Sequence, residues 1–282
     1  MASAAVTICT HSSSKIPDFP VGADGRPVPA MGVGTSTYPP VAEDVVRAAV
    51  LSALELGYRH LDTAALYGSE RVVGEAVAEA TRRGIVASRK EVFVTTKLWC
   101  TQCYPDLVLP SLRESLQNLE MDYVDLYLVH WPMTTKPSKP HFPIKREDIM
   151  PIDLSGVWRA MEECHRLGLA RMIGVSNFTT KKLQELLAIA KIPPAISLRW
   201  INEQGASMVV KGLKRERLKE NMEIFDWELT DEDRVKINQI LQHKKVTVLG
   251  ILFLEGVYSM DISEADIVEM CSFCRRHAET VG

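Results

Sequence analysis

Five strand-like apolar segments alternate with five amphipathic helical segments between residues 31 and 190. This alternation is typical of a parallel sheet, because a chain that returns to start a parallel strand needs a crossover, usually a helix. The strands are expected at Met31–Gly34, His60–Ala64, Val92–Lys97, Val124–His130 and Ala170–Ser176. The helices are expected at Ala42–Leu56, from the capping Ser69 to Gly84, and at Val108–Leu119, Leu154–Leu167 and Thr179–Ala190.

Polar side chains at the carboxyl ends of these strands favour a closed barrel over an open sheet. Asp62, Lys97, His130 and the pair Ser176–Asn177 each end a different strand. In a (β/α)8 barrel such ends converge on one mouth, where active sites lie. An open doubly wound sheet usually has a glycine-rich turn after its first strand, and Gly32–Gly34 lacks the third glycine of that turn. The sequence therefore predicts an α/β chain of the (β/α)8 TIM-barrel type.

The alternation stops after the fifth helix. A further strand is expected at Ser207–Lys211 and a helix at Glu216–Phe225, so little chain separates Ala190 from the next strand. About two βα units of the barrel cannot fit into that space, and we expect them to be missing after residue 195. An incomplete barrel has two strand edges with unpaired backbone groups. We expect the last strand to re-close the sheet by pairing near the fifth strand or the stub at Ala195.

The overall composition excludes several classes of function. Of 282 residues, 46% are apolar and 24% are charged, as in ordinary globular domains. A net charge of -3 provides no basic surface for nucleic acid or an anionic membrane, and no apolar run is long enough to span a bilayer. We expect a monomer that binds a small molecule and holds no metal.

The ends of the chain and the cysteines bear on location. Residues 1–15 are small and polar, which predicts a disordered tail ahead of one domain at residues 16–282. Their serine-rich, acid-poor composition leaves a transit peptide as an alternative to a cytoplasmic location. Six cysteines are expected to be free thiols, as in a reducing cytoplasm. The spacing of Cys100 with Cys103, and of Cys271 with Cys274, leaves a zinc or redox site as an alternative.

Four of the polar residues suit the delivery of a proton to a carbonyl oxygen. Tyr67 follows Asp62 in the segment between Gly57 and Gly74, and a free tyrosine has a pKa of about 10. To donate a proton at neutral pH it needs a nearby cation that favours the phenolate, which Lys97 can supply. Asp62 can hold that lysine charged and oriented. His130 can donate a hydrogen bond to the carbonyl as a hydride reaches the carbon.

Three segments of the chain resemble the signatures of the aldo-keto reductase superfamily. Gly57–Ala64, with Glu70 and Gly74, is similar to the first signature, and Met172–Phe178 is similar to the second. Val209–Lys211, with Arg217 and Asn221, is similar to the third. The resemblance extends from about residue 16 onward and is to plant members such as the deoxymugineic acid synthases, codeinone reductases and chalcone reductases.

The resemblance implies an NADPH-dependent oxidoreductase that reduces an aldehyde or ketone to an alcohol. It implies that Tyr67 is the general acid, that Lys97 and Asp62 tune it, and that His130 orients the substrate. The implied cofactor-binding residues are Gly34, Thr35, Ser176, Asn177, Lys211, Arg217, Glu220 and Asn221. The implied walls of the substrate pocket are Ser36, Trp99 and Trp131.

The chain departs from the family pattern at three places. Ser36 stands where many relatives have Trp, and Gly212 stands where the family has Ser or Thr. The part missing between Ala195 and Ser197 would carry a Gln that binds the carboxamide, a Tyr that stacks on the nicotinamide and a loop that holds the pyrophosphate. We therefore expect weakened NADPH binding. A catalytically impaired or silent shortened isoform, with a binding or regulatory role, is the alternative.

Overall fold

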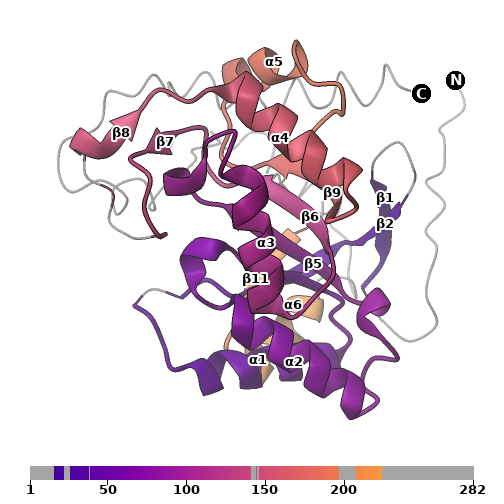
Figure 1. The fold of residues 1–282 in the computed structure, drawn as a ribbon. Helices are drawn as coiled ribbons and strands as arrows, with labels where there is room; N and C mark the ends of the chain where they lie inside the picture. Colours follow the sequence, from indigo (N-terminus) through magenta and orange to yellow (C-terminus); the bar gives the residue numbers. More distant parts are fainter. Residues whose placement is uncertain are drawn as a thin grey trace, which may run out of the picture.

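The computed structural model describes residues 16–21, 26–37, 39–140, 144, 146–196 and 208–223 (Figure 1). Expectations for residues 1–15, for Cys271 and Cys274, and for the chain between Ser197 and Ser207 lie outside these residues. So does the part of the expected last helix that follows Glu223. The division into a tail and one domain stays a prediction.

A seven-stranded sheet forms the centre of the described chain. In spatial order it contains β10 (Ala195–Ile196), β9 (Ala170–Val175), β6 (Val124–Val129), β5 (Phe93–Leu98), β4 (His60–Asp62), β3 (Met31–Gly34) and β11 (Met208–Lys211). All neighbouring strands are parallel. The five strands expected from the alternation are therefore confirmed, with ends that differ by at most two residues.

Helices connect and cover these strands. They are α1 (Glu43–Leu56), α2 (Glu70–Arg82), α3 (Val108–Leu119), α4 (Leu154–Arg166), α5 (Thr180–Leu187) and α6 (Arg215–Met222). Figure 1 shows α2, α3 and α4 following one another across one face of the sheet. Side chains alternate along a strand, so Leu61, Val94 and Tyr127 face these helices in the main core. The opposite face of these strands carries Asp62 and Lys97, together with His60 and Thr95.

The last strand lies where we did not expect it. β11 pairs with β3 over four residues, from Met208 opposite Met31 to Lys211 opposite Gly34. It does not pair with the fifth strand or with β10, so the predicted re-closure is wrong for the described chain. The physical reason is ladder length, because β10 has two residues whereas the free edge of β3 offers four. Among the described residues, β10 and β11 each have a strand neighbour on one side only.

Among the described residues, two antiparallel strand pairs form small sheets separate from the central one. β1 (Asp18–Val21) pairs with β2 (Arg26–Pro29), and Val28 packs with Phe93 and Leu126 against the inner face of the sheet. β7 (Thr134–Thr135) pairs with β8 (Ile149–Met150) in the long connection after β6. The hydroxyl of Tyr104 donates to the carbonyl of Thr135 at 2.9 Å, which ties this connection to the turn after β5. No described helix is both long and apolar enough to cross a membrane.

Candidate active site

Adjacent strands bring the predicted proton-delivery residues together. Asp62 ends β4 and lies opposite Thr95 on β5, two residues before Lys97. Lys97 lies opposite Leu128 on β6, two residues before His130. Because alternate residues share a face, all three polar side chains belong to the same side of the sheet. Each is almost completely buried, so none of these charges and dipoles is screened by bulk water.

In the part of the chain that the structure describes, the ammonium of Lys97 has three hydrogen-bond acceptors. It donates to Oδ1 of Asp62 at 2.5 Å, to the backbone carbonyl of Thr63 at 3.0 Å and to the phenol oxygen of Tyr67 at 3.4 Å. Burial alone lowers the pKa of Lys97. The charge of Asp62 and the contact with Tyr67 together raise the pKa by more than burial lowers it, so the net shift is upward. The lysine therefore stays charged beside the phenol at neutral pH.

His130 faces the same phenol from the other side. Its Nε2 lies 3.4 Å from the hydroxyl of Tyr67, and the two rings meet edge to face with centroids 5.5 Å apart. Burial and the charge of Lys97 hold the pKa of His130 well below its usual range. The imidazole is neutral at physiological pH, so only one of its nitrogens carries a proton. A neutral ring can donate a hydrogen bond without adding a second buried cation.

An apolar wall adjoins these polar groups. Trp99 is fully buried and meets His130 edge to face at 5.1 Å, and Trp131 is 8% exposed. Ser36 is exposed, in keeping with a position at a pocket rim. The sequence did not reveal the other members of the wall, because they come from separate loops with no periodic pattern. They are Cys100, Met133 and Ile144, with the partly buried Leu66 and Ile149.

The structure places Ser176 and Asn177 beside His130. Asn177 adopts a left-handed conformation with φ of 62°, which asparagine tolerates better than most residues. Its amide donates to the carbonyl of His130 at 2.9 Å and to the hydroxyl of Ser176 at 3.0 Å. The end of β9 is thereby fixed against the end of β6.

The expected cofactor residues of the first strand lie at the end of β3. Gly34 is the last residue of that strand and lies opposite Asp62. Thr35 is buried, and its hydroxyl donates to the backbone carbonyl of Asp62 at 3.1 Å. It also contacts the hydroxyl of Ser69 at 2.8 Å. These two contacts occupy the Thr35 hydroxyl, so this side chain holds the backbone of Asp62 in place.

The residues of the third signature lie on β11 and α6, and β3 separates β11 from the strand that carries Asp62. Lys211 ends β11 at the edge of the sheet, and Arg217, Glu220 and Asn221 follow on α6. The guanidinium side chain of Arg217 is 74% exposed and lies 3.2 Å from the carboxylate of Glu220. The hydroxyl of Tyr58 donates to the carbonyl of Leu218 at 2.8 Å, which anchors α6 against the end of α1.

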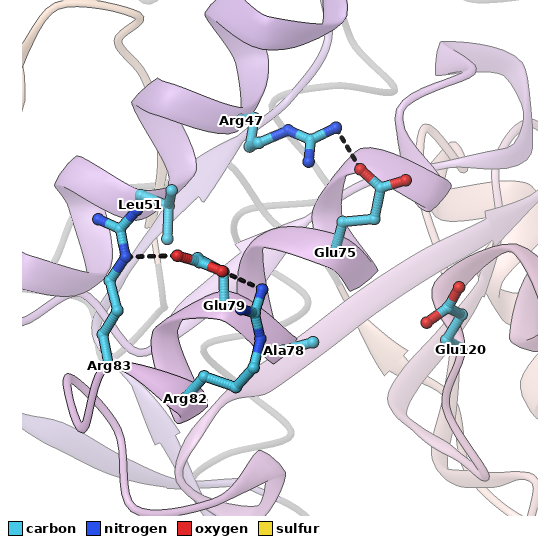
Figure 2. A pocket seen from close by; sticks show the side chains of 8 residues that line it. All are labelled: Arg47, Leu51, Glu75, Ala78, Glu79, Arg82, Arg83 and Glu120. Atoms are coloured by element: carbon cyan, nitrogen blue, oxygen red, sulfur yellow. Dashed lines mark hydrogen bonds and ion pairs between the residues drawn. The ribbon is translucent and has the colours of Figure 1, made fainter.

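A surface groove of about 520 Å³ on α1 and α2 is a separate feature (Figure 2). Its arginines are paired with carboxylates, Arg47 with Glu75 and Arg83 with Glu79. These exposed pairs compensate one another and leave no reacting group. Its lining is Arg47, Leu51, Glu75, Ala78, Glu79, Arg82, Arg83 and Glu120.

The described cysteines are free and buried. Burial raises the pKa of Cys103 and of Cys164 to about 12, and it raises the pKa of Cys100 as well. Thiols with raised pKa values are poor nucleophiles and poor metal ligands. Within the described ranges, no three His, Cys, Asp or Glu side chains gather in a way that could hold a metal ion.

Two supporting residues were not predicted as part of the site. Thr63 binds Lys97 through its backbone carbonyl, which no side-chain pattern can reveal. Ser69 was expected to cap α2, but its side chain makes no capping hydrogen bond to that helix. Its hydroxyl instead contacts Thr35 and Thr63, at 2.8 and 2.9 Å. Thr179, the first residue of the helix expected at Thr179–Ala190, caps α5, since its hydroxyl accepts from the backbone N–H of Lys182 at 3.2 Å.

Comparisons with known proteins bear on the same residues. A model of the "Aldo/keto reductase family" matches residues 30–197. Deoxymugineic acid synthase 1-D of Triticum aestivum is 42% identical, over 77% of this chain and 89% of that protein. D-galacturonate reductase of Fragaria ananassa is 40% identical, over 82% of this chain and 92% of that protein. The crystal structure of a Bombyx mori aldo-keto reductase in complex with NADP is 31% identical, with a TM-score of 0.69 over 79% of this chain and 92% of that one.

The alignment with the Triticum aestivum protein contains more positions than the residues of this chain that take part in it. It runs over 280 positions yet spans only 77% of the 282 residues here. The relative therefore has positions with no counterpart in this chain.

Proposed function

The chain belongs to the aldo/keto reductase family, and from this premise we propose that its buried proton-delivery group reduces an aldehyde or ketone to an alcohol with NADPH. The observation that carries the proposal is the contact of one ammonium, that of Lys97, with both Asp62 and the phenol of Tyr67. The reductase names of the relatives support carbonyl reduction rather than a silent isoform.

The residues present fit NADPH at two places. At the ends of β6 and β9, Ser176 and Asn177 supply hydroxyl and amide groups beside His130, suited to a carboxamide. At the start of α6, Arg217 has an exposed guanidinium, which suits the adenosine 2′-phosphate. Lys211, Glu220 and Asn221 would complete that end, and Gly34 and the backbone of Thr35 would line the path between the two. When bound, NADPH supplies the hydride.

We assign each residue of the proton-delivery group a role. Tyr67 gives its phenolic proton to the substrate oxygen, and the ammonium of Lys97 stabilises the phenolate that this leaves. Asp62 keeps the ammonium charged and oriented. Neutral His130 donates a hydrogen bond to the same oxygen and so fixes the carbonyl in place. The buried aromatic wall of Trp99 and Trp131, with Ser36 at the rim, would shield the reacting atoms from water and suits an apolar or aromatic substrate.

We also propose that the chain acts as a cytoplasmic monomer, shortened internally near residues 195–197. The free thiols of Cys100, Cys103 and Cys164 support a reducing compartment. The two-residue length of β10 and the unmatched positions of the wheat relative support the shortening. Light scattering of the purified chain tests the monomer, and a longer transcript containing the missing segment would support the shortening.

The decisive experiment is NADPH oxidation by the purified chain with an aromatic aldehyde and with D-galacturonate. Tyr67→Phe keeps the ring and removes the proton, so we expect its rate to fall at least about 100-fold. NADH in place of NADPH controls for cofactor choice. Equal rates for the wild type and Tyr67→Phe would overturn the proposed function, since the assigned proton donor would then contribute nothing.

A further inference from the structure

Ser69 joins two strand ends through one hydroxyl. Its Oγ lies 2.8 Å from Oγ1 of Thr35, which follows β3, and 2.9 Å from Oγ1 of Thr63, which follows β4. All three side chains are at most 5% exposed, so water does not compete for these contacts. Ser69 immediately precedes α2, yet it does not use its hydroxyl to cap that helix.

Which hydroxyl donates and which accepts in each of these contacts follows from the number of protons available. Each hydroxyl has one proton to donate. Thr35 uses its proton on the backbone carbonyl of Asp62, at 3.1 Å. Ser69 must therefore donate to Thr35, and Thr63 must donate to Ser69. Hydrogen bonds aligned in this way polarise and strengthen one another.

The series of hydroxyls begins at Thr63 and ends at the carbonyl of Asp62, and both residues lie next to the ammonium of Lys97. The backbone carbonyl of Thr63 accepts from that ammonium at 3.0 Å, and the carboxylate of Asp62 accepts at 2.5 Å. The Asp62–Thr63 segment thus supplies two of its three acceptors, and the hydroxyls fix this segment to β3. The third acceptor is the phenol of Tyr67, which is joined to Ser69 through Gly68 alone.

We propose that Ser69 is a positioning residue for proton delivery, holding the Asp62–Thr63 segment and the Tyr67 loop at the distance at which Lys97 stabilises the phenolate. This inference rests on the proposed reductase function and adds a residue to it. Without the hydroxyl, Thr63 loses its link to β3, and only the bonds from Thr35 to the carbonyl of Asp62 remain. The Asp62–Thr63 segment can then shift and carry the ammonium away from the phenol. A displacement of about 1 Å at a reacting group lowers rates substantially.

The pH dependence of hydride transfer separates positioning from a general structural role. Among the described residues, Lys97 from β5 and His130 after β6 contact the phenol of Tyr67, and Asp62 from β4 is paired with that lysine. A weaker contact with Lys97 favours the protonated phenol. In the Ser69→Ala variant, we therefore expect the alkaline fall in rate to move upward by about half a pH unit or more.

The test measures single-turnover hydride transfer from NADPH to an aromatic aldehyde, across pH, for the wild type and Ser69→Ala. We expect the rate at neutral pH to fall about 10-fold, with KM changed less than about twofold. Ser111→Ala is the matched control, since Ser111 is a buried serine whose hydroxyl donates to Gln102 rather than to the strand ends. Its pH profile should match that of the wild type. If Ser69→Ala does not fold, Thr63→Val takes its place. It removes the first donor of the three hydroxyls and should give the rate and pH profile expected for Ser69→Ala.

Two outcomes overturn the proposal. One is a Ser69→Ala rate and pH profile equal to those of the wild type. The other is a loss of rate, in both variants, that follows the unfolded fraction with no change in pH profile.

A wild type without reductase activity would overturn the proposed function instead. In that case the ultraviolet absorbance of tyrosinate, as the difference from Tyr67→Phe, still tests Ser69. An upward shift of the Tyr67 titration in Ser69→Ala supports positioning, and no shift refutes it.

Discussion

The Nζ atom of Lys97 lies 2.5 Å from Oδ1 of Asp62, and both side chains are at most 10% exposed. Removing one partner of such a pair leaves an uncompensated buried charge, at a loss of about 3–5 kcal/mol of unfolding free energy. We therefore expect Lys97→Met and Asp62→Asn each to destabilise the protein strongly. Urea unfolding measures these losses.

The double variant Asp62→Asn/Lys97→Met separates stability from activity. Because neither charge is left, its unfolding free energy should return most of the way to that of the wild type. Its NADPH oxidation should stay at least about 100-fold below the wild type, since no cation remains to favour the phenolate. Recovery of activity in the double variant would show that Lys97 has no role in proton delivery.

Gly74 on α2 approaches the backbone of α3 closely. A Cβ atom at this position would lie 2.2 Å from the carbonyl oxygen of Leu119, and a backbone group cannot move aside as a flexible side chain can. Helix propensity alone predicts that Gly74→Ala stabilises α2 by about 1 kcal/mol. The clash predicts the opposite sign, a loss of about 2 kcal/mol or more. The sign of the change in Tm decides between them.

The buried His60 makes stability depend on pH. Burial is the main reason that its pKa falls from 6.5 to about 4, and the charge of Lys97 adds to the fall. Between these two values the unfolded state binds the proton and the folded state does not, so stability is complete above about pH 6.5 and declines as the pH falls. The loss should approach about 3 kcal/mol near pH 4.

Replacing His60 tests this assignment. His60→Gln keeps a polar group near the hydroxyl of Thr95, which His60 contacts at 3.0 Å, and cannot gain a proton, so its stability should depend less on pH between 7 and 4. His130 has a lowered pKa too, so part of the decline should remain. Unfolding midpoints in urea at a series of pH values give the comparison. Parallel curves for the two proteins would rule out His60 as a source.

Arg217 should discriminate between the two nicotinamide cofactors. Its side chain is exposed and paired only with exposed Glu220 in the described chain, so Arg217→Ala should change stability by less than about 1 kcal/mol. We expect KM for NADPH to rise about 10-fold while KM for NADH is unchanged, because only NADPH carries the 2′-phosphate. Arg215→Ala removes an arginine of the same helix that is paired with Glu55, and it serves as the control.

Local pattern was enough to predict the strands and the polar residues that come together at their ends. Apolar runs end in Asp62, Lys97 and His130, and a polar residue at the end of a buried strand is informative because it cannot be explained by packing. The neighbouring helices follow from periodicity in the same way. What pattern could not supply is the set of distances that lets one ammonium contact both Asp62 and Tyr67.

Longer-range choices were not predictable from the sequence. The pairing of β11 with β3 depends on which edge offers the longer ladder, and a single segment contains no record of that. The β1–β2 hairpin was missed because its short strands contain Pro20, Pro27 and Pro29, which usually argue against a strand. Ser69 matched the local preference for a helix cap, whereas its hydroxyl is used by residues distant in sequence.

The unequal edges of the sheet imply an order in which it opens. β10 is held to β9 by two residue pairs, whereas β9 and β6 share five. Native-state fraying should therefore begin at Ala195 and spread inward, so backbone amides near β10 exchange with deuterium first. The strands that carry Asp62 and Lys97, β4 and β5, lie inside the sheet, so their amides should exchange later. We therefore expect the residues proposed to deliver the proton to lie in a more slowly exchanging part of the sheet than β10.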